Sequence, residues 1–220
     1  MQIYYASHAA HRAYFASLAL ECRGKSVLEY GSGSGLACFD LAAAGARVAA
    51  IDISDVAIEK GRREAARRGI EVDFRVGDAE RMPFGQASFD LVCGSGILHH
   101  LRIAPALDEV ARVLKPGGRA VFIEPMGHNP LLRLFRWLTP SLRSPDERAL
   151  RPQDLALFQG RYREVRMHYY DLLSLFAIPL LPLAPGRALF RALERADAAL
   201  FAGLPPLRSH AGFVVIEARA

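Results

Sequence analysis

The sequence predicts a doubly wound α/β domain, in which helices cover both faces of a mostly parallel sheet. Between residues 26 and 124, short apolar runs alternate with stretches of helical composition. Parallel strands need a helical crossover between them, so this alternation indicates a parallel sheet. A length of 220 residues with a hydrophobic fraction of 51% provides a core for one such domain, without room for an independent second one.

The elements of the first half can be taken in order. A helix is expected over residues 4–22, and an amphipathic helix over residues 103–114. Residues 115–118 (KPGG) end the second helix, because proline cannot continue it and glycine accepts a positive φ. Helical stretches also follow the first two apolar runs. The runs themselves predict strands at residues 26–30, 46–51, 72–76, 89–93 and 119–124.

The alternation weakens after Pro125, where arginine-rich helices are expected at residues 131–138, 153–159, 171–178 and 186–201. Strands at 162–169 and 212–217 complete a Rossmann-like sheet of seven strands, the C-terminal one antiparallel. We therefore expect a single domain over residues 1–220. It comprises a cap helix (1–24), a ligand-binding core (25–124) and a substrate-side helical half (125–220).

The charge and the cysteine content limit the kinds of partner and the cell compartment to expect. The net charge is +5 with a pI near 9.4, but the excess is scattered arginine. The basic residues between 60 and 68 are interleaved with glutamates, as on a solvated helix face, so no nucleic-acid site is expected. Cys22, Cys38 and Cys93 have neither disulfide nor zinc spacing, which fits a cytoplasmic protein.

A glycine-rich turn follows the first predicted strand. Gly31, Gly33 and Gly35 let a ligand approach the backbone, and the helix that follows offers free N–H groups. The alternative is a tight strand-to-helix connection without a ligand. Asp52 ends the second strand about twenty residues later, where a carboxylate accepts hydrogen bonds from ribose hydroxyls. This pattern suits a nicotinamide dinucleotide or S-adenosylmethionine equally.

Two residues distinguish between these two candidate ligands. The dinucleotide pattern GxGxxG requires glycine at position 36, and the residue there is Leu36. Glu29 places a negative charge beside the turn, which disfavours a pyrophosphate and favours a cationic ligand. A dinucleotide-dependent oxidoreductase is therefore the weaker hypothesis.

Five ordered motifs between residues 26 and 124 then resemble the class I S-adenosylmethionine-dependent methyltransferases. They are similar to the bacterial group of ubiquinone/menaquinone C-methyltransferases and natural-product O-methyltransferases. The motifs are VLEYGSGSG, AIDIS, GDAERMPF, SFDLVCGSGILHHL and RVLKPGG.

This resemblance implies that the cofactor is S-adenosyl-L-methionine. Asp52 would hold the ribose, Ile53 would pack on the adenine, and Asp78 would accept the adenine amino group unless it is only a helix N-cap. Glu29 and the turn would surround the methionine part, and Ser95 would lie beneath the sulfonium. The full implied set is Glu29, Gly31, Ser32, Gly33, Gly35, Asp52, Ile53, Gly77, Asp78, Ala79, Gly94 and Ser95.

Candidate catalytic residues follow the fourth and fifth strands. An oxygen nucleophile must lose its proton, and histidine is suited to accept it near neutral pH. We expect His99 to be this base, oriented by Glu124, with His100 and His128 as further candidates. The alternative is that the histidine pair only shapes a loop and caps the next helix. Glu124, His128 and Asn129 offer only a partial metal site, so no metal is expected.

The acceptor is the least determined part. We expect a small molecule, namely a hydroxyl of a hydrophobic or glycosylated natural product. C-methylation of a quinone-type ring, methylation of a lipid and a noncatalytic adenosylmethionine-binding partner protein are the alternatives, and a homodimer is left open. Residues 172–183 are either a buried helix pair broken by Pro179 or a peripheral membrane contact near Arg187, Arg191 and Arg195. Apolar-pocket candidates, otherwise core, are Phe135, Trp137, Phe158, Tyr162, Tyr169 and Phe176.

Overall fold

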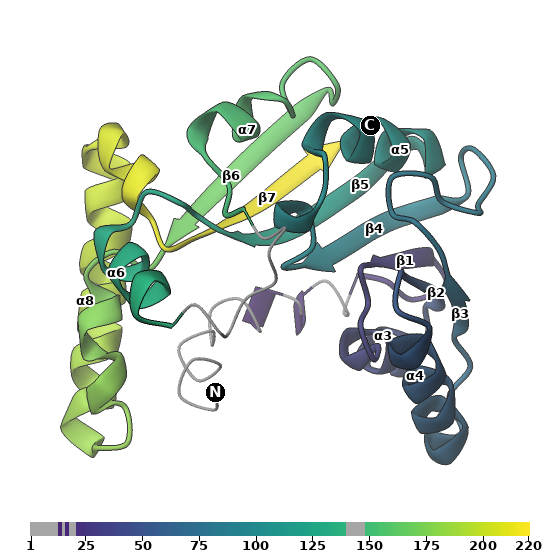
Figure 1. Cartoon of the computed structure of the whole chain (residues 1–220), viewed down its shortest axis with the longest axis horizontal. Helices are drawn as coiled ribbons and strands as arrows, with labels where there is room; N and C mark the ends of the chain where they lie inside the picture. The colour runs from purple at the N-terminus through teal and green to yellow at the C-terminus, as the bar shows by residue number, and fades with distance from the viewer. Residues whose placement is uncertain (1–12, 15, 18–20, 140–147) are drawn as a thin grey trace.

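A seven-stranded sheet forms the centre of the molecule (Figure 1). The computed structural model describes residues 13–14, 16–17, 21–139 and 148–220. The strand order is β3-β2-β1-β4-β5-β7-β6, and all pairings are parallel except those of β7 with β5 and β6. The predicted sheet with its antiparallel C-terminal strand is confirmed. The strands are β1 (Ser26–Tyr30), β2 (Arg47–Asp52), β3 (Asp73–Val76), β4 (Phe89–Ser95), β5 (Leu114–Pro125), β6 (Glu164–Tyr170) and β7 (Phe213–Arg219).

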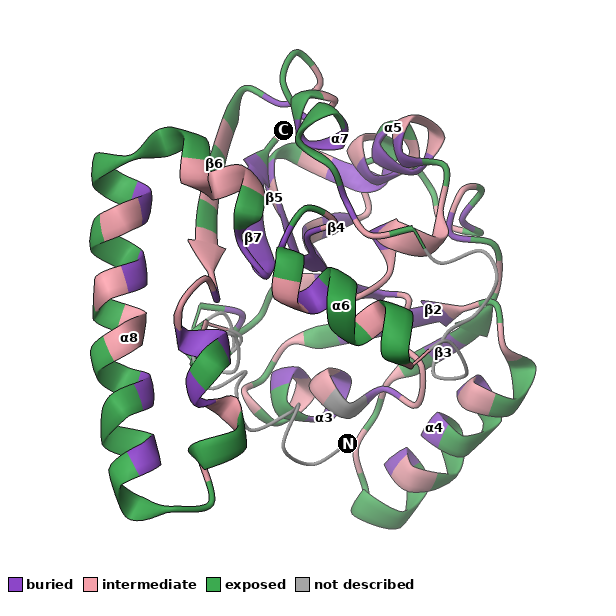
Figure 2. Ribbon diagram, turned by 60° about the vertical axis from the view of Figure 1, so that its left-hand side comes forward, coloured by how far each residue is buried: buried purple, intermediate pink, exposed green. Residues whose placement is uncertain are grey.

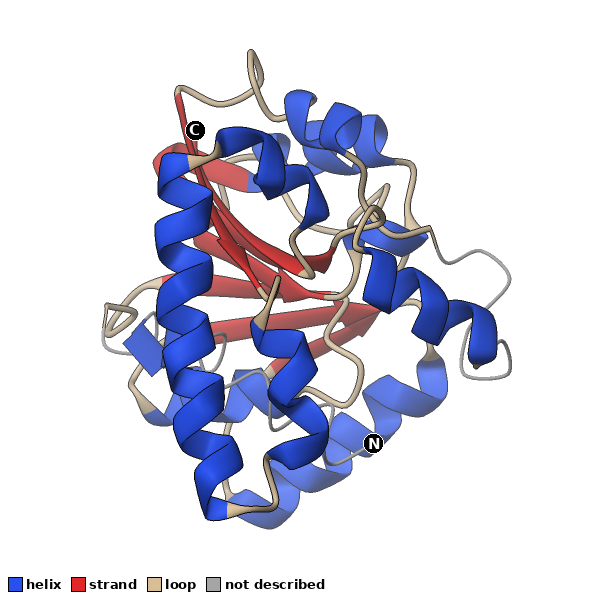
Figure 3. Ribbon diagram, turned by 90° about the vertical axis from the view of Figure 1, so that its left-hand side faces the viewer, coloured by secondary structure: helices blue, strands red, loops and turns tan. Residues whose placement is uncertain are grey.

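Helices cover both faces of this sheet (Figure 3). Phe39 of α3 and Ile58 of α4 are buried in one core cluster, while Leu107 of α5 and Phe201 of α8 belong to the cluster on the other face. Among the described residues, no helix has both the length and the apolar character needed to cross a bilayer. The helices are α3 (Leu36–Ala43), α4 (Asp55–Arg68), α5 (Ile103–Val113), α6 (Pro130–Leu138), α7 (Pro152–Ala156) and α8 (Ala184–Gly203), and the 3₁₀ helices are η1 (Leu98–His100), η3 (Ser174–Leu180) and η4 (Pro205–His210).

The expected N-terminal helix over residues 4–22 lies mostly outside the described residues. Residues 13–14 and 16–17 are helical. Tyr14 packs against the core cluster on the α3 and α4 face of the sheet. A cap role for residues 1–24 stays a prediction.

The helix expected at residues 171–178 is instead the short 3₁₀ helix η3. The buried carboxylate of Asp197 accepts the backbone N–H groups of Leu172, Leu173 and Ser174 at 2.7–3.1 Å, which caps the turn at its start. Pro179 inside η3 lacks an N–H, so it donates no helical hydrogen bond there.

Two further boundaries differ from the sequence-based expectation. The strand β5 begins at Leu114, directly after α5, so residues 115–118 are an irregularity within the strand instead of a separate turn. The pairing with β4 shifts register between Phe89 and Leu91 at this point. The helix α7 ends at Ala156, three residues before the expected end.

Gly94, in β4, is required by a close backbone approach. A Cβ atom there would lie 2.6 Å from the carbonyl oxygen of Tyr30 and 3.0 Å from Cγ2 of Ile97. The carbonyl belongs to the neighbouring strand and cannot move without disturbing the β1 and β4 pairing. Glycine therefore lets the strand ends meet at the edge of the sheet where the candidate site lies.

We expect Gly94→Ala to lower the free energy of unfolding by about 1–3 kcal/mol, because the added methyl group overpacks a backbone contact. Urea denaturation monitored by circular dichroism measures this change. Gly203→Ala, at the end of α8 with no atom within 4 Å of the added carbon, is the matched control and should be nearly neutral. An unchanged midpoint for Gly94→Ala would contradict the steric argument.

Candidate active site

The predicted site residues gather at one edge of the sheet. The strands β1, β2, β4 and β5 are mutually parallel, so their C-terminal ends lie at the same edge. Glu29 lies beside Cys93 in the register of β1 and β4, and Ser95 lies beside Ile123 in that of β4 and β5. Ligands of open α/β sheets bind at this edge.

The glycine turn after β1 has the backbone geometry expected of a ligand cradle. Gly31, Gly33 and Gly35 all have φ in the left-handed region, at 68°, 52° and 74°. A Cβ atom at Gly31 would overlap the side chain of Ile97, which lies in the loop after β4. Gly33 has no atom within 4 Å of such a Cβ position, so the turn is open there.

Glu29 is buried at the end of β1 against the start of α3. Its carboxylate accepts the backbone N–H of Cys38 at 3.0 Å, and the Cys38 thiol also donates to it. The helix N-terminus is a favourable place for an anion. Burial nevertheless raises the pKa of Glu29 to about 7, because desolvation outweighs these hydrogen bonds.

Asp52, at the end of β2, is held by the two loops beside it. Its carboxylate accepts the backbone N–H of Gly33 at 2.7 Å and that of Ser54 at 2.9 Å. The carboxylate is thus oriented between the glycine turn and the start of α4. Ile53, next in the chain, is 79% exposed, so a planar ligand can reach its side chain.

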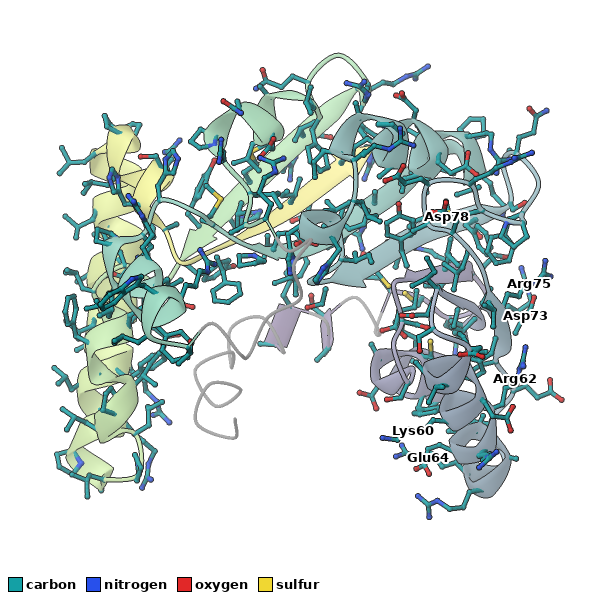
Figure 4. All side chains as sticks on the ribbon, in the orientation of Figure 1. Lys60, Arg62, Glu64, Asp73, Arg75 and Asp78 are labelled. Atoms are coloured by element: carbon teal, nitrogen blue, oxygen red, sulfur yellow. The ribbon has the colours of Figure 1, made fainter. Side chains whose placement is uncertain are left out.

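The loop after β3 carries the third predicted acid. Asp78 is exposed, and its carboxylate accepts the N–H of Glu80 at 2.8 Å (Figure 4 labels Asp78). The carbonyl of Ala79 accepts the Tyr30 hydroxyl at 2.9 Å, and Gly77 donates its N–H to the carbonyl of Asp52 at 3.0 Å. These contacts attach the loop to the ends of β1 and β2.

The expected histidine–glutamate pair is in contact. Nδ1 of His99 lies 2.8 Å from Oε2 of Glu124, which is completely buried. Oε1 of Glu124 accepts the backbone N–H groups of Ile97 and Leu98 at 2.9 and 2.8 Å. Because a carboxylate only accepts, Nδ1 of His99 is the donor in this contact. The His99 side chain is 9% exposed.

The other two histidines are placed differently. The ring of His100 contacts that of His99, with 4.2 Å between centroids and the planes tilted by 37°, while His128 is exposed at the start of the segment leading to α6. Asn129 caps α6 through Leu132 and donates to the carbonyl of His210, so its side chain serves the fold. Within the described part of the chain, no group of three or more potential ligands is arranged to hold a metal.

The predicted aromatic pocket is not assembled as one unit. Phe158 and Tyr162 stack on each other in the core, with 6.1 Å between ring centroids. Phe135, Trp137 and Phe176 are 41%, 76% and 64% exposed. Figure 2 shows long exposed faces on α6 and α8. Tyr169 alone of the predicted set lines one of the two described cavities.

The basic cluster of α4 is a solvated face, as expected. Arg63 pairs with Glu59, and both Arg67 and Arg68 pair with Glu64. Ile58 of this helix is buried toward the sheet and Arg62 donates to the carbonyl of Phe74 in β3, whereas Lys60 is exposed (Figure 4 labels Lys60 and Arg62). Its charges are thus largely balanced along the helix.

Sequence reasoning missed two contributors to the site. Cys38 is the hydrogen-bonding partner of Glu29, and Ile97 covers the glycine at position 31. The first was accessible, since Cys38 occupies the first turn of the helix after the glycine turn and an acid at the strand end can cap it. The contact of Ile97 depends on packing alone.

Several known proteins are similar to the part of the chain that carries this site. Residues 28–122 match a family model described as "Methyltransferase domain". A demethylmenaquinone methyltransferase of Clavibacter sepedonicus is 42% identical over 102 residues, which cover 46% of this chain and 41% of the relative. A ubiquinone biosynthesis O-methyltransferase of Xanthomonas axonopodis pv. citri is 35% identical over 121 residues, which cover 54% of this chain and 50% of the relative.

A solved structure shares this likeness. The structure described as SAM-dependent methyltransferases from Methanosarcina mazei is 25% identical, with a TM-score of 0.55, and covers 67% of this chain and 84% of that one. The chain spans half the length, or less, of the two curated relatives that it matches here. The family match, residues 28–122, includes the glycine turn.

The buried acid of β1 makes a testable contribution to stability. The pKa of Glu29 is raised from 4.5 to about 7, so the folded protein keeps a proton that the unfolded chain releases. The free energy of unfolding therefore falls as pH rises through this interval. We expect Glu29→Gln to raise the free energy of unfolding by up to about 3 kcal/mol near pH 8 and by far less near pH 4.

Urea denaturation of both proteins at the two pH values measures this difference. Glu71→Gln, on the exposed surface after α4, is the matched control and should change little at either pH. A difference for Glu29→Gln that does not grow with pH would contradict a raised pKa in the folded state.

Proposed function

We propose that this chain transfers a methyl group from S-adenosylmethionine to a small-molecule acceptor, because residues 28–122 match a family model described as "Methyltransferase domain". The single observation that carries the proposal is the row of carboxylates around the glycine turn. Glu29 and Asp52 lie at the ends of β1 and β2, and Asp78 follows β3, and these three strands are neighbours in the same sheet. They surround a backbone cradle that is open at Gly33.

The residues of this row fit the proposed donor. Asp52 is oriented by two backbone N–H groups and has remaining lone pairs for the hydroxyls of a ribose. The exposed side chain of Ile53 offers an apolar surface for the adenine, and Asp78 an acceptor for its amino group. Glu29 supplies negative charge for a cationic ligand. Repulsion by these acids disfavours a diphosphate in the same place.

The proposed chemistry needs few protein groups. When bound, S-adenosylmethionine supplies a methyl carbon already activated by its positively charged sulfur. Glu124 holds Nδ1–H of His99, which leaves Nε2 to accept the proton of an acceptor hydroxyl. The backbone bonds of Ile97 and Leu98 to Glu124 keep that pair in place. His99 is thus the proposed base, while His100 and His128 stay alternatives.

We favour an acceptor hydroxyl because the His99–Glu124 pair is arranged to remove a proton. The second candidate is C-methylation of a quinone-type ring, and the Clavibacter sepedonicus relative is named as a demethylmenaquinone methyltransferase. The Xanthomonas axonopodis pv. citri relative is named as an O-methyltransferase. The two alternatives therefore differ in the acceptor, with the donor unchanged.

The donor is tested first by binding. We expect isothermal calorimetry to give saturable binding of S-adenosylmethionine and S-adenosylhomocysteine, and Asp52→Asn to weaken both by about tenfold or more, because charged hydrogen bonds to the sugar are lost. Asp55→Asn, at the neighbouring exposed start of α4, is the matched control and should bind normally. Preferential binding of NADH would overturn the proposed donor.

The acceptor and the base are tested together. A labelled-methyl transfer screen over an extract of the source cells, followed by mass spectrometry, identifies the product and the methylated atom. With that acceptor, His99→Ala should lower turnover by about a hundredfold or more. His168→Ala, whose ring pairs with Glu217 on the β6 and β7 surface, should leave turnover unchanged. Full turnover by His99→Ala would dismiss His99 as the base.

A further inference from the structure

A cavity of about 440 Å³ lies between the end of β6 and the helix α8. It is formed by residues of the substrate-side half, outside the matched family region. Its volume is sufficient for a small organic group. The residues that line it are Tyr169, Tyr170, Asp171, Arg191, Glu194, Arg195, Asp197 and Ala198.

This cavity opens at the same edge of the sheet as the candidate active site. The strand β6 is antiparallel to β7, which is antiparallel to β5, so β5 and β6 run in the same direction. Pro125 and Tyr170 both pair with Phe213, so the two strand ends are level. In Figure 1 β6 points toward α8. With strands spaced about 4.8 Å apart, the cavity begins roughly 10 Å from the end of β5, where Glu124 lies.

Asp171 is the unusual residue of this cavity. It is 5% exposed, and its Oδ2 atom has no hydrogen-bond partner among the protein groups described. Its Oδ1 atom has only a long contact of 3.4 Å with Oγ of Ser174. Its φ is 64°, a left-handed conformation that few residues other than glycine adopt at low cost. Buried hydrogen-bond acceptors nearly always have a partner. The fold supplies none for Oδ2 of Asp171, so this oxygen has an unfilled acceptor position.

Neighbouring acids make the environment of Asp171 negative. Asp197 is buried, but its carboxylate is satisfied by three backbone N–H groups and the Ser174 hydroxyl. Burial, together with the charges of Glu194 and Asp197, raises the pKa of Asp171 to about 7. A cation in the cavity would relieve this repulsion.

The arginines of α8 do not supply that cation. Arg191 and Arg195 line the cavity, and Arg191 acts electrostatically on Glu194, yet neither bonds to Oδ2 of Asp171. The tyrosines offer ring surfaces, and aromatic faces attract cations. The guanidinium of Arg208 already lies 5.9 Å from the ring centroid of Tyr169. The unfilled requirement is therefore a small hydrogen-bond donor with a positive charge.

We infer that this cavity binds a cationic amine of the methyl acceptor, with Asp171 as its anionic hydrogen-bonding partner. That the amine belongs to the methyl acceptor rests on the proposed function. The amine site itself is argued from the contacts of Asp171 alone. It places the basic group roughly 10 Å, two strand spacings, from the end of β5, where Glu124 orients the proposed base. The acceptor is then an elongated molecule with an amine at one end and the nucleophilic atom at the other.

The experiment uses a matched pair of probes, cyclohexylamine and cyclohexanol, which differ in charge and hydrogen-bond donors but little in shape. Each is titrated into the full chain near pH 7.5, and backbone amide resonances are followed by NMR. We expect cyclohexylammonium to shift the amides of Asp171 and Ala198 with a dissociation constant in the millimolar range, about −4 kcal/mol at 1 mM, as for a fragment-sized ligand. Cyclohexanol should bind at least about tenfold more weakly.

Asp171→Asn is the decisive variant, because asparagine keeps the size of the side chain and tolerates the left-handed conformation. It should weaken cyclohexylammonium about tenfold, whereas Glu194→Gln should have a smaller effect. Asp73→Asn, on the opposite edge strand β3, where the carboxylate pairs with the exposed Arg75, is the matched control (Figure 4). Full affinity of Asp171→Asn would overturn the inference.

The remaining outcomes are equally decisive. Equal affinities for the two probes would overturn the amine assignment, since recognition would then depend on shape. Absence of shifts with either probe would overturn the site itself. A parallel titration with S-adenosylhomocysteine separates the two proposals. If the amine binds and S-adenosylhomocysteine does not, the proposed function alone is overturned. If S-adenosylhomocysteine binds and the amine does not, this inference alone is overturned.

Discussion

One buried carboxylate holds the candidate catalytic edge together. Glu124, at the end of β5, accepts the backbone N–H groups of Ile97 and Leu98 and the imidazole of His99. A buried carboxylate destabilises the fold unless its acceptor sites are filled, so the loop after β4 adopts the conformation that fills them. The same loop places Ile97 over Gly31. The bonds to Glu124 thus position both Ile97, which covers the glycine turn, and His99, the proposed base.

Two other buried acids are less well compensated, and each belongs to one of the two proposed ligand sites. Glu29 is satisfied in part by the start of α3, while Asp171 has an oxygen without a protein partner. Burial raises the pKa of each to about 7. Groups in this condition reduce the stability of the ligand-free fold and gain most from a cationic partner. Asp197 provides the contrast within the same protein. Its buried carboxylate is compensated, because it accepts three backbone N–H groups and the Ser174 hydroxyl.

Much of the fold could be predicted because the patterns that encode it are local. All seven strands were predicted within two residues at their starts, apart from β5, because apolar runs of this length between helices have few other interpretations. The error at η3 has a tertiary cause. Its composition is helical, but Asp197, more than twenty residues away, captures the N–H groups of residues 172–174. Periodicity within a segment carries no information about such a partner.

The sequence by itself determined the sheet, the glycine turn and the positions of Glu29, Asp52 and Glu124 at strand ends, since strand direction and motif spacing follow from neighbouring residues. Only the tertiary structure decided what those side chains contact. It joined Glu29 to Cys38, brought Glu124 to the loop of His99, and left Oδ2 of the enclosed Asp171 without a protein partner. Burial and charge proximity depend on segments far apart in the chain, and they arise only when those segments pack.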